Sequence, residues 1–77
     1  MDNYNKLIDM MLNHYRSASN SYVFAVTFKN TEEMEYYKGE CLALWSILTN
    51  TSLSYEQQNK LSEITRERIA KLAIIVK

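Results

Sequence analysis

The chain contains no proline and a single glycine in 77 residues. Small domains made of β-strands rely on both residue types for their tight turns, so this scarcity favours a helical fold. Side chains three and four residues apart share one face of a helix, and mostly apolar or small residues follow that spacing here. They stand at positions 4, 7, 11, 14, 18, 21, 25 and 28, and again at positions 34, 37, 41, 44 and 48. The pattern predicts an all-α protein.

One segment, SYVFAVTFKN at residues 21–30, also has the two-residue alternation of a β-strand. Valine, phenylalanine and threonine at this density favour extended structure. The alternative fold is therefore α+β, with a strand at residues 21–29. We prefer the helix because the 3–4 spacing continues through this segment and because no other segment offers an obvious strand partner.

Two short polar segments separate the predicted helices. In KNTEE, Asn30 can cap the following helix, with Glu33 three residues later as in a capping box. In TNTSLS, Ser54 and Gln57 repeat that pattern. We expect one domain over residues 1–77, with helices at about 2–29, 31–49 and 55–75. The first two helices are expected to form an antiparallel hairpin, and the first to extend beyond it and meet the third.

The predicted third helix carries a charged side chain within its apolar stripe. Projected at about 100° per residue, Arg68 falls between Leu61 and Leu72. A guanidinium in such a place needs a carboxylate or must extend into solvent. We expect a structural ion pair with Glu40, and the alternative is an arginine that faces a partner molecule. The stripe consists of Leu61, Ile64, Ile69, Leu72, Ile75 and Val76.

The titratable residues show no arrangement typical of catalysis or metal binding. Cys41 is the only cysteine, so no disulfide can form within the chain, and no cysteine–histidine spacing matches a zinc site. His14 holds a core-like position about two helical turns from Cys41, where a structural histidine is expected. One glycine is too few for a glycine-rich phosphate loop. We predict a non-enzymatic protein that needs no metal and no cofactor.

Nothing in the sequence indicates secretion or insertion into a membrane. The N-terminal MDNYNKLIDMM has charges inside its apolar run, unlike a signal peptide. No stretch approaches the roughly 18 apolar residues of a membrane span. The lack of disulfides suits a reducing compartment. We expect a soluble, cytoplasmic protein.

The charges of the chain cancel, with nine basic and nine acidic residues. A neutral chain lacks the field that drives non-specific nucleic-acid binding. Four glutamates and two lysines give residues 21–50 a charge of −2, and five basic and three acidic residues give residues 51–77 a charge of +2. Arg66 and Lys71 of the predicted third helix therefore support an alternative function, a small nucleic-acid-binding regulator.

Aromatic residues are abundant, with six tyrosines, two phenylalanines and one tryptophan. Phe24 and Tyr36 lie off the stripes that join the first two helices, and large aromatic side chains dominate protein-binding hot spots. We predict a protein-binding surface at Phe24, Tyr36, Trp45 and Arg68. A chain this short buries only about 60–65% of its unfolded surface, so we expect a homodimer or support from a larger partner.

The hairpin region has further features in common with a known group of proteins. They are Ala25, KNTEE, YYKG at residues 36–39 and ALWSIL at residues 43–48. On these features residues 22–48, about a third of the chain, resemble a helical hairpin of small accessory proteins of bacteriophages and mobile elements. Such proteins often act as stoichiometric binders. The resemblance therefore implies an inhibitor or adaptor that acts on a host enzyme or an anti-phage defence protein in the host cytosol.

Overall fold

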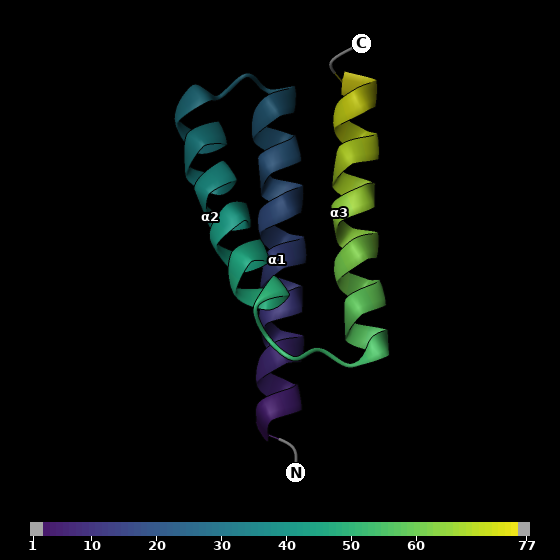
Figure 1. The fold of residues 1–77 in the computed structure, drawn as a ribbon. Coiled ribbons are helices and arrows are strands. Elements are labelled where there is room, and N and C mark those ends of the chain that lie inside the picture. The colour runs from purple at the N-terminus through teal and green to yellow at the C-terminus, as the bar shows by residue number, and fades with distance from the viewer. Residues whose placement is uncertain (1–2, 76–77) are drawn as a thin grey trace.

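The structure is a computed structural model that describes residues 3–75 and consists of three α-helices (Figure 1). Helix α1 spans Asn3–Thr27, α2 spans Thr31–Thr49 and α3 spans Tyr55–Ile75. No strand is present in this part of the chain. The all-α prediction with three helices is confirmed. The alternative strand at residues 21–29 is wrong, because α1 continues through Thr27. Residue 2, which the prediction placed in the first helix, lies outside the described residues.

Helix α1 ends in a turn that reverses the direction of the chain. Lys29 has a φ of 56°, in the left-handed region. Its N–H donates to the carbonyl of Val26 at 3.1 Å, and the N–H of Asn30 donates to the carbonyl of Ala25 at 2.9 Å. These two bonds form a Schellman motif, whose left-handed position is usually occupied by glycine. The motif ends α1 and leads directly into α2.

Side-chain caps fix where α2 and α3 begin. Asn30 Oδ1 accepts a hydrogen bond from the N–H of Glu33 at 3.1 Å, which satisfies one free donor of the first turn of α2. At α3, the N–H of Gln57 donates to Ser54 Oγ at 3.1 Å, and the N–H of Ser54 donates to Gln57 Oε1 at 2.9 Å. This reciprocal pair is a complete capping box. Both helices therefore start where the cap residues in the sequence predict.

Helix α1 supports the other two helices. Helix α2 runs antiparallel to α1 and α3 runs parallel to it, so that both lie against α1 (Figure 1). Within the described residues, no Cα atom of α2 lies within 8 Å of a Cα atom of α3. The body is elongated, with extents of 43 × 21 × 17 Å. Because α2 and α3 do not pack against each other, neither helix shields the facing side of the other from solvent.

The core is small and is formed mainly by α1. Residues from α2 and α3 complete it, and Met11, Tyr22, Leu44 and Leu53 pack around it with partial exposure. The buried core residues are Ile8, Leu12, Tyr15, Ala18, Cys41, Leu48, Leu61 and Ile64.

Among the described helices, none combines the length and the apolar character that a membrane span requires.

The buried face of α1 differs from the predicted one. Ala18 and Ala25 are buried as expected, but Leu7, His14 and Phe28 are exposed. The reason is that α1 packs against two helices, so its buried sector is centred between them and not on the face toward α2 alone. In α3, Ile69 is exposed, and Val76 lies outside the described residues. The buried residues of α1 are Ile8, Leu12, Tyr15, Ala18, Ser19 and Ala25.

Candidate docking groove

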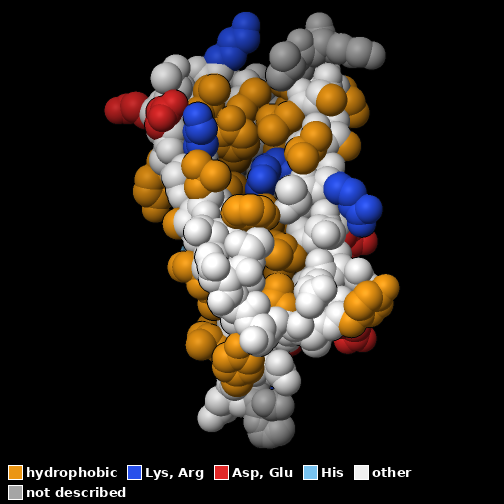
Figure 2. All heavy atoms as spheres, viewed as in Figure 1, with side chains coloured by type: hydrophobic (Ala, Val, Ile, Leu, Met, Phe, Trp, Pro, Cys, Tyr) orange, Lys and Arg blue, Asp and Glu red, His pale blue; other side chains and the backbone are white. Residues whose placement is uncertain are grey.

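A groove runs between α2 and α3, and side chains of α1 help to form it. Its volume is about 370 Å³. Figure 2 shows hydrophobic side chains gathered along this side of the molecule with cationic side chains among them, while the acidic side chains lie toward the edges of the view. We call this feature the α2/α3 groove. It is lined by Tyr22, Lys38, Cys41, Leu42, Trp45, Thr65 and Arg68.

The wall formed by α2 is an exposed stripe with helical spacing. Lys38, Leu42 and Trp45 follow one another at intervals of four and three residues, which places them on one face of α2. Leu42 is 58% exposed and Trp45 is 45% exposed. Large apolar side chains with this much contact with water, side by side along a groove, are typical of interaction sites. The wall is therefore a surface on which another apolar element can pack.

Arg68 is held in the groove by hydroxyl groups of α1. Its Nη1 donates to Tyr15 Oη at 3.0 Å and to Ser19 Oγ at 2.8 Å. Thr65 Oγ1 donates its only proton to the carbonyl of Leu61 at 3.0 Å, so the 2.8 Å bond between Tyr15 and Thr65 has the tyrosine as donor. Tyr15 Oη can then accept from Arg68 without conflict. This network holds the guanidinium in one place.

Among the described residues, the guanidinium of Arg68 has no acidic partner. Within residues 3–75, no carboxylate oxygen lies within 4.0 Å of it, and both of its hydrogen bonds go to neutral hydroxyls. Its Cζ atom also lies 5.3 Å from the centre of the Tyr15 ring. A guanidinium carries five N–H donors, and the two bonds of Nη1 leave those of Nε and Nη2. In the described residues no fully buried side-chain nitrogen lacks a partner, so these donors keep some contact with solvent, and Arg68 is one of the residues that line the groove.

The predicted ion pair between Glu40 and Arg68 is wrong. Glu40 Oε2 lies 3.5 Å from Nε2 of His14, a residue of α1. Successive residues of a helix point about 100° apart, so Glu40 projects away from the groove that Cys41 lines. His14 was expected at a core-like position, but its side chain is 58% exposed. The charge of Arg68 is consequently left without a counter-ion among residues 3–75.

The structure brings together two of the four predicted partner-binding residues. Trp45 and Arg68 line the α2/α3 groove. Phe24 instead lines a separate depression between α1 and α2, together with Tyr37. The exposed ring of Tyr36 packs edge-on against that of Tyr37, with centroids 5.0 Å apart. Phe24 and Tyr36 thus belong to a second aromatic region and not to the groove.

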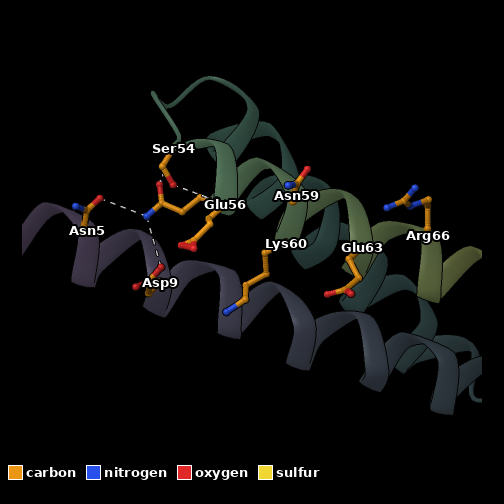
Figure 3. Close-up of a pocket in the computed structure, with 9 residues that line it drawn as sticks. Asn5, Asp9, Ser54, Glu56, Asn59, Lys60, Glu63 and Arg66 are labelled. Atoms are coloured by element: carbon orange, nitrogen blue, oxygen red, sulfur yellow. Dashed lines mark hydrogen bonds between the residues drawn. The ribbon is translucent and has the colours of Figure 1, made fainter.

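The residues proposed for nucleic-acid contact lie away from the groove. Lys71 Nζ is 3.4 Å from Asn20 Oδ1. Arg66 lines an open polar depression of about 790 Å³ between α1 and α3, shared with Asp9, Glu56 and Glu63 (Figure 3). Although this depression is larger than the groove, its lining of mixed charges and amides is that of a solvated surface. Gln57 Nε2 donates across it to Asn5 Oδ1 at 3.3 Å and to Asp9 Oδ1 at 3.5 Å.

Sequence reasoning missed the role of Lys38 and Leu42 in the groove. The signal was present in the sequence. The core-facing series of α2 has a 3–4 spacing, and the same spacing recurs one position later in Glu35, Lys38, Leu42 and Trp45.

No group of three or more described His, Cys, Asp or Glu side chains is arranged to hold a metal ion. No family model matches the chain, and no curated protein or solved structure shows significant similarity to it.

Proposed function

We propose that the chain is a non-enzymatic protein-binding module whose α2/α3 groove receives an amphipathic helix that carries a carboxylate. The observation that supports this most is the accessible guanidinium of Arg68 between apolar walls. An arginine fork binds a carboxylate through two parallel hydrogen bonds, and this geometry is the strongest that arginine forms with an acid. Leu42 and Trp45 supply the apolar contact.

A helix is the element that fits this site. Helix-in-groove recognition uses apolar anchors spaced three and four residues apart, and the groove runs between two helices that already lie against α1. A fourth helix there would cover the sides of α2 and α3 that do not touch each other. Tryptophan and arginine, the residue types of Trp45 and Arg68, are also enriched among binding hot spots.

Selection from a displayed library of helical peptides tests this proposal. The chain is immobilised at low density, so that each molecule is alone. We expect the enriched peptides to share apolar residues at helical spacing and one Asp or Glu, to bind Trp45→Ala at least tenfold more weakly, and to shift the emission of Trp45 to the blue. Trp45 is the only tryptophan, so the signal is unambiguous. Enriched peptides that bind Trp45→Ala as well as the wild type would refute the proposal.

The nucleic-acid alternative has weaker support, because the depression that Arg66 lines holds three carboxylates, Asp9, Glu56 and Glu63, against two cations, Arg66 and Lys60, so its lining does not favour phosphate. It makes a distinct prediction. Phosphate-driven binding falls steeply with salt, by about 10³-fold or more between roughly 50 and 200 mM for a protein with six or more phosphate contacts. Binding anchored by apolar side chains changes little over that range.

The expectation of an inhibitor or adaptor that acts on a host or defence protein comes from the bacteriophage resemblance. In our proposal such a target would contribute the helix that enters the groove. A selected peptide sequence gives a direct way to search for that target, because it specifies the apolar spacing and the position of the acid. That the target is a host protein or a defence protein stays a prediction.

A further inference from the structure

We infer that the helix received by the groove is α2 of a second copy of this chain, whose Glu35 carboxylate binds the open edge of Arg68. This inference rests on the proposed function, because it names the occupant of the same groove. It follows from the composition of the groove and of α2, taken together.

The groove needs negative charge and α2 carries it. Lys38 and Arg68 are the charged residues of the groove lining, and both are cationic. Helix α2 holds four glutamates and one lysine, TEEMEYYKGECLALWSILT. Of these glutamates, Glu35 stands on the exposed stripe with Lys38, Leu42 and Trp45, so it is the carboxylate that a second copy can bring to the cationic lining. A second copy also brings this helix to the groove at the same concentration as the groove itself.

Helix α2 also has the apolar pattern that the groove requires. Its exposed stripe of Glu35, Lys38, Leu42 and Trp45 has the 3–4–3 spacing of coiled-coil seam positions. The stripe is symmetric about its midpoint. When two copies of α2 lie antiparallel, Lys38 of each copy faces Leu42 of the other, and Glu35 faces Trp45.

The same pairing brings an acid toward Arg68. Trp45 and Arg68 line one groove, so Glu35 of the partner copy, placed against Trp45, enters the groove that holds the open guanidinium edge. The long side chain of Lys38 can cover Leu42 of the partner with its methylene groups and keep its ammonium in water. Each α2 then lies against the α2 and α3 of the other copy, and both grooves are filled by one two-fold contact.

The size of the protein favours a permanent occupant. A chain of 77 residues buries a smaller share of its unfolded surface than a larger domain does, and its core here has few large side chains. Leu42, Trp45 and Ile69 remain exposed when the chain is alone. A second copy removes Leu42 and Trp45 from water.

Light scattering across a dilution series tests the inference with the full chain. We expect a mass of twice the 9.1 kDa of one chain for the wild type and a monomer for Leu42→Lys. The matched control is Ile47→Lys, which makes the same change on the same helix at a residue that is 51% exposed and outside the groove lining. This variant should remain a dimer. A monomeric wild type, or equal masses for the two variants, would overturn the inference.

A charge exchange tests the Glu35–Arg68 contact. Glu35→Arg and Arg68→Glu alone should each raise the dissociation constant of the dimer by about tenfold or more, and the double variant should recover at least half of that loss on a logarithmic scale. If Arg68→Glu does not fold, because Tyr15 and Ser19 lose their donor, Glu35→Gln measures the contact alone. A dimer that is equally strong in Glu35→Gln contradicts the assigned contact.

The two proposals fail in different ways. A monomeric wild type that still selects acidic amphipathic peptides would leave the proposed function in place and remove the second copy as occupant. A monomeric wild type that selects no such peptide would remove both. A dimer that Leu42→Lys dissociates, and Ile47→Lys does not, supports both.

Discussion

At the scale of single residues, Arg68 is stabilised by an unusual set of neighbours. A half-buried cation usually has a carboxylate nearby, but here two hydroxyl groups and an aromatic face take that place. Neutral acceptors hold the group in position without cancelling its charge. The structure therefore keeps at the groove a cation that is oriented and still able to bind an anion.

The hydroxyl of Tyr15 is expected to contribute to stability through this arrangement. In Tyr15→Phe the ring still fills the core, but Arg68 loses one acceptor and Thr65 loses its donor. Each lost hydrogen bond costs about 1 kcal/mol, so the free energy of unfolding should fall by about 1–2 kcal/mol in urea titrations. Tyr22→Phe, at a partly buried tyrosine of the same helix, is the control and should change it by less. A Tyr15→Phe variant as stable as the wild type would show that the Tyr15 hydroxyl makes no net contribution to the free energy of unfolding.

Gly39 is expected to weaken α2. It lies inside the helix, and a Cβ built on it would meet no atom within 4 Å. Glycine in a helix interior is about 1 kcal/mol less favourable than alanine, so Gly39→Ala should raise the free energy of unfolding by about that amount. Chemical denaturation measures the change. A loss of stability would mean that another molecule approaches α2 at this residue.

Lys29 is expected to carry backbone strain, because it occupies the left-handed position of the turn after α1. Lys29→Gly relieves roughly 1–2 kcal/mol of strain but makes the unfolded chain about 0.4–1 kcal/mol more favourable. The net result should be a gain of up to about 1.6 kcal/mol in a thermal or urea titration. Lys29→Ala removes the same charge and keeps the strain, so it should give no gain. Equal gains in the two variants would assign the effect to charge.

At the scale of elements, the start of α3 is tied to α1 through one buried side chain. Gln57 completes the capping box with Ser54, and its Nε2 donates to Asn5 Oδ1 at 3.3 Å and to Asp9 Oδ1 at 3.5 Å (Figure 3). One amide thus fixes both where α3 begins and where it lies against α1.

We expect Gln57→Leu to separate the contribution of the Gln57 hydrogen bonds to stability from that of burying its side chain. Leucine keeps the volume but removes the acceptor for Ser54 and the donor for α1, and the expected loss is about 2 kcal/mol of unfolding free energy. Gln58→Leu, at an exposed neighbouring position, removes one hydrogen bond to the carbonyl of Leu53 and should lower stability by less, about 0.5–1 kcal/mol. Chemical denaturation of both variants measures the difference. Equal losses in the two variants would contradict the role assigned to Gln57.

The boundaries of the helices could be predicted from the sequence more fully than the sides on which the helices are buried. The caps at Asn30 and Ser54 act locally, so the starts of α2 and α3 follow from residues within a few positions. Which side of α1 is buried depends on two neighbouring helices, and a single periodic stripe indicates only one contact face. For this reason His14 was assigned to a core-like position while Ile8 and Leu12 were not.

The candidate site was predicted in part for the same reason. Trp45 and Arg68 stand out by residue type, and both line the groove. The partners of Arg68 could not be found from sequence, because Tyr15 and Ser19 are about 50 positions away and their approach depends on the register between α1 and α3. Glu40 lies at the edge of the predicted apolar face of the second helix, which suggested it as a partner, but the rotation of α2 turns it toward His14.

At the scale of the whole molecule, α1 packs against both other helices, while α2 and α3 pack only against α1. Separation of α2 or α3 from α1 exposes one interface, whereas opening of α1 exposes both. Leu12 and Tyr15 of α1 are fully buried, as is Leu48 of α2. The fold is therefore stabilised by the contacts that α1 makes with α2 and with α3. The groove between α2 and α3 adds little stability unless another molecule fills it.

This arrangement makes thermal stability depend on protein concentration if a second copy fills the groove. Unfolding of a dimer to two chains costs an extra 1.4 kcal/mol for each tenfold rise in concentration, which corresponds to an increase of about 3–6 °C in Tm for an assembly of roughly 150 residues. Leu42→Lys should have a lower Tm that does not change with concentration, and Ile47→Lys should behave as the wild type does. Circular dichroism at protein concentrations a hundredfold apart measures this. A wild-type Tm that is constant across that range would mean that the monomer is stable with its groove open, and the exposed Leu42 and Trp45 would then be available to a different protein.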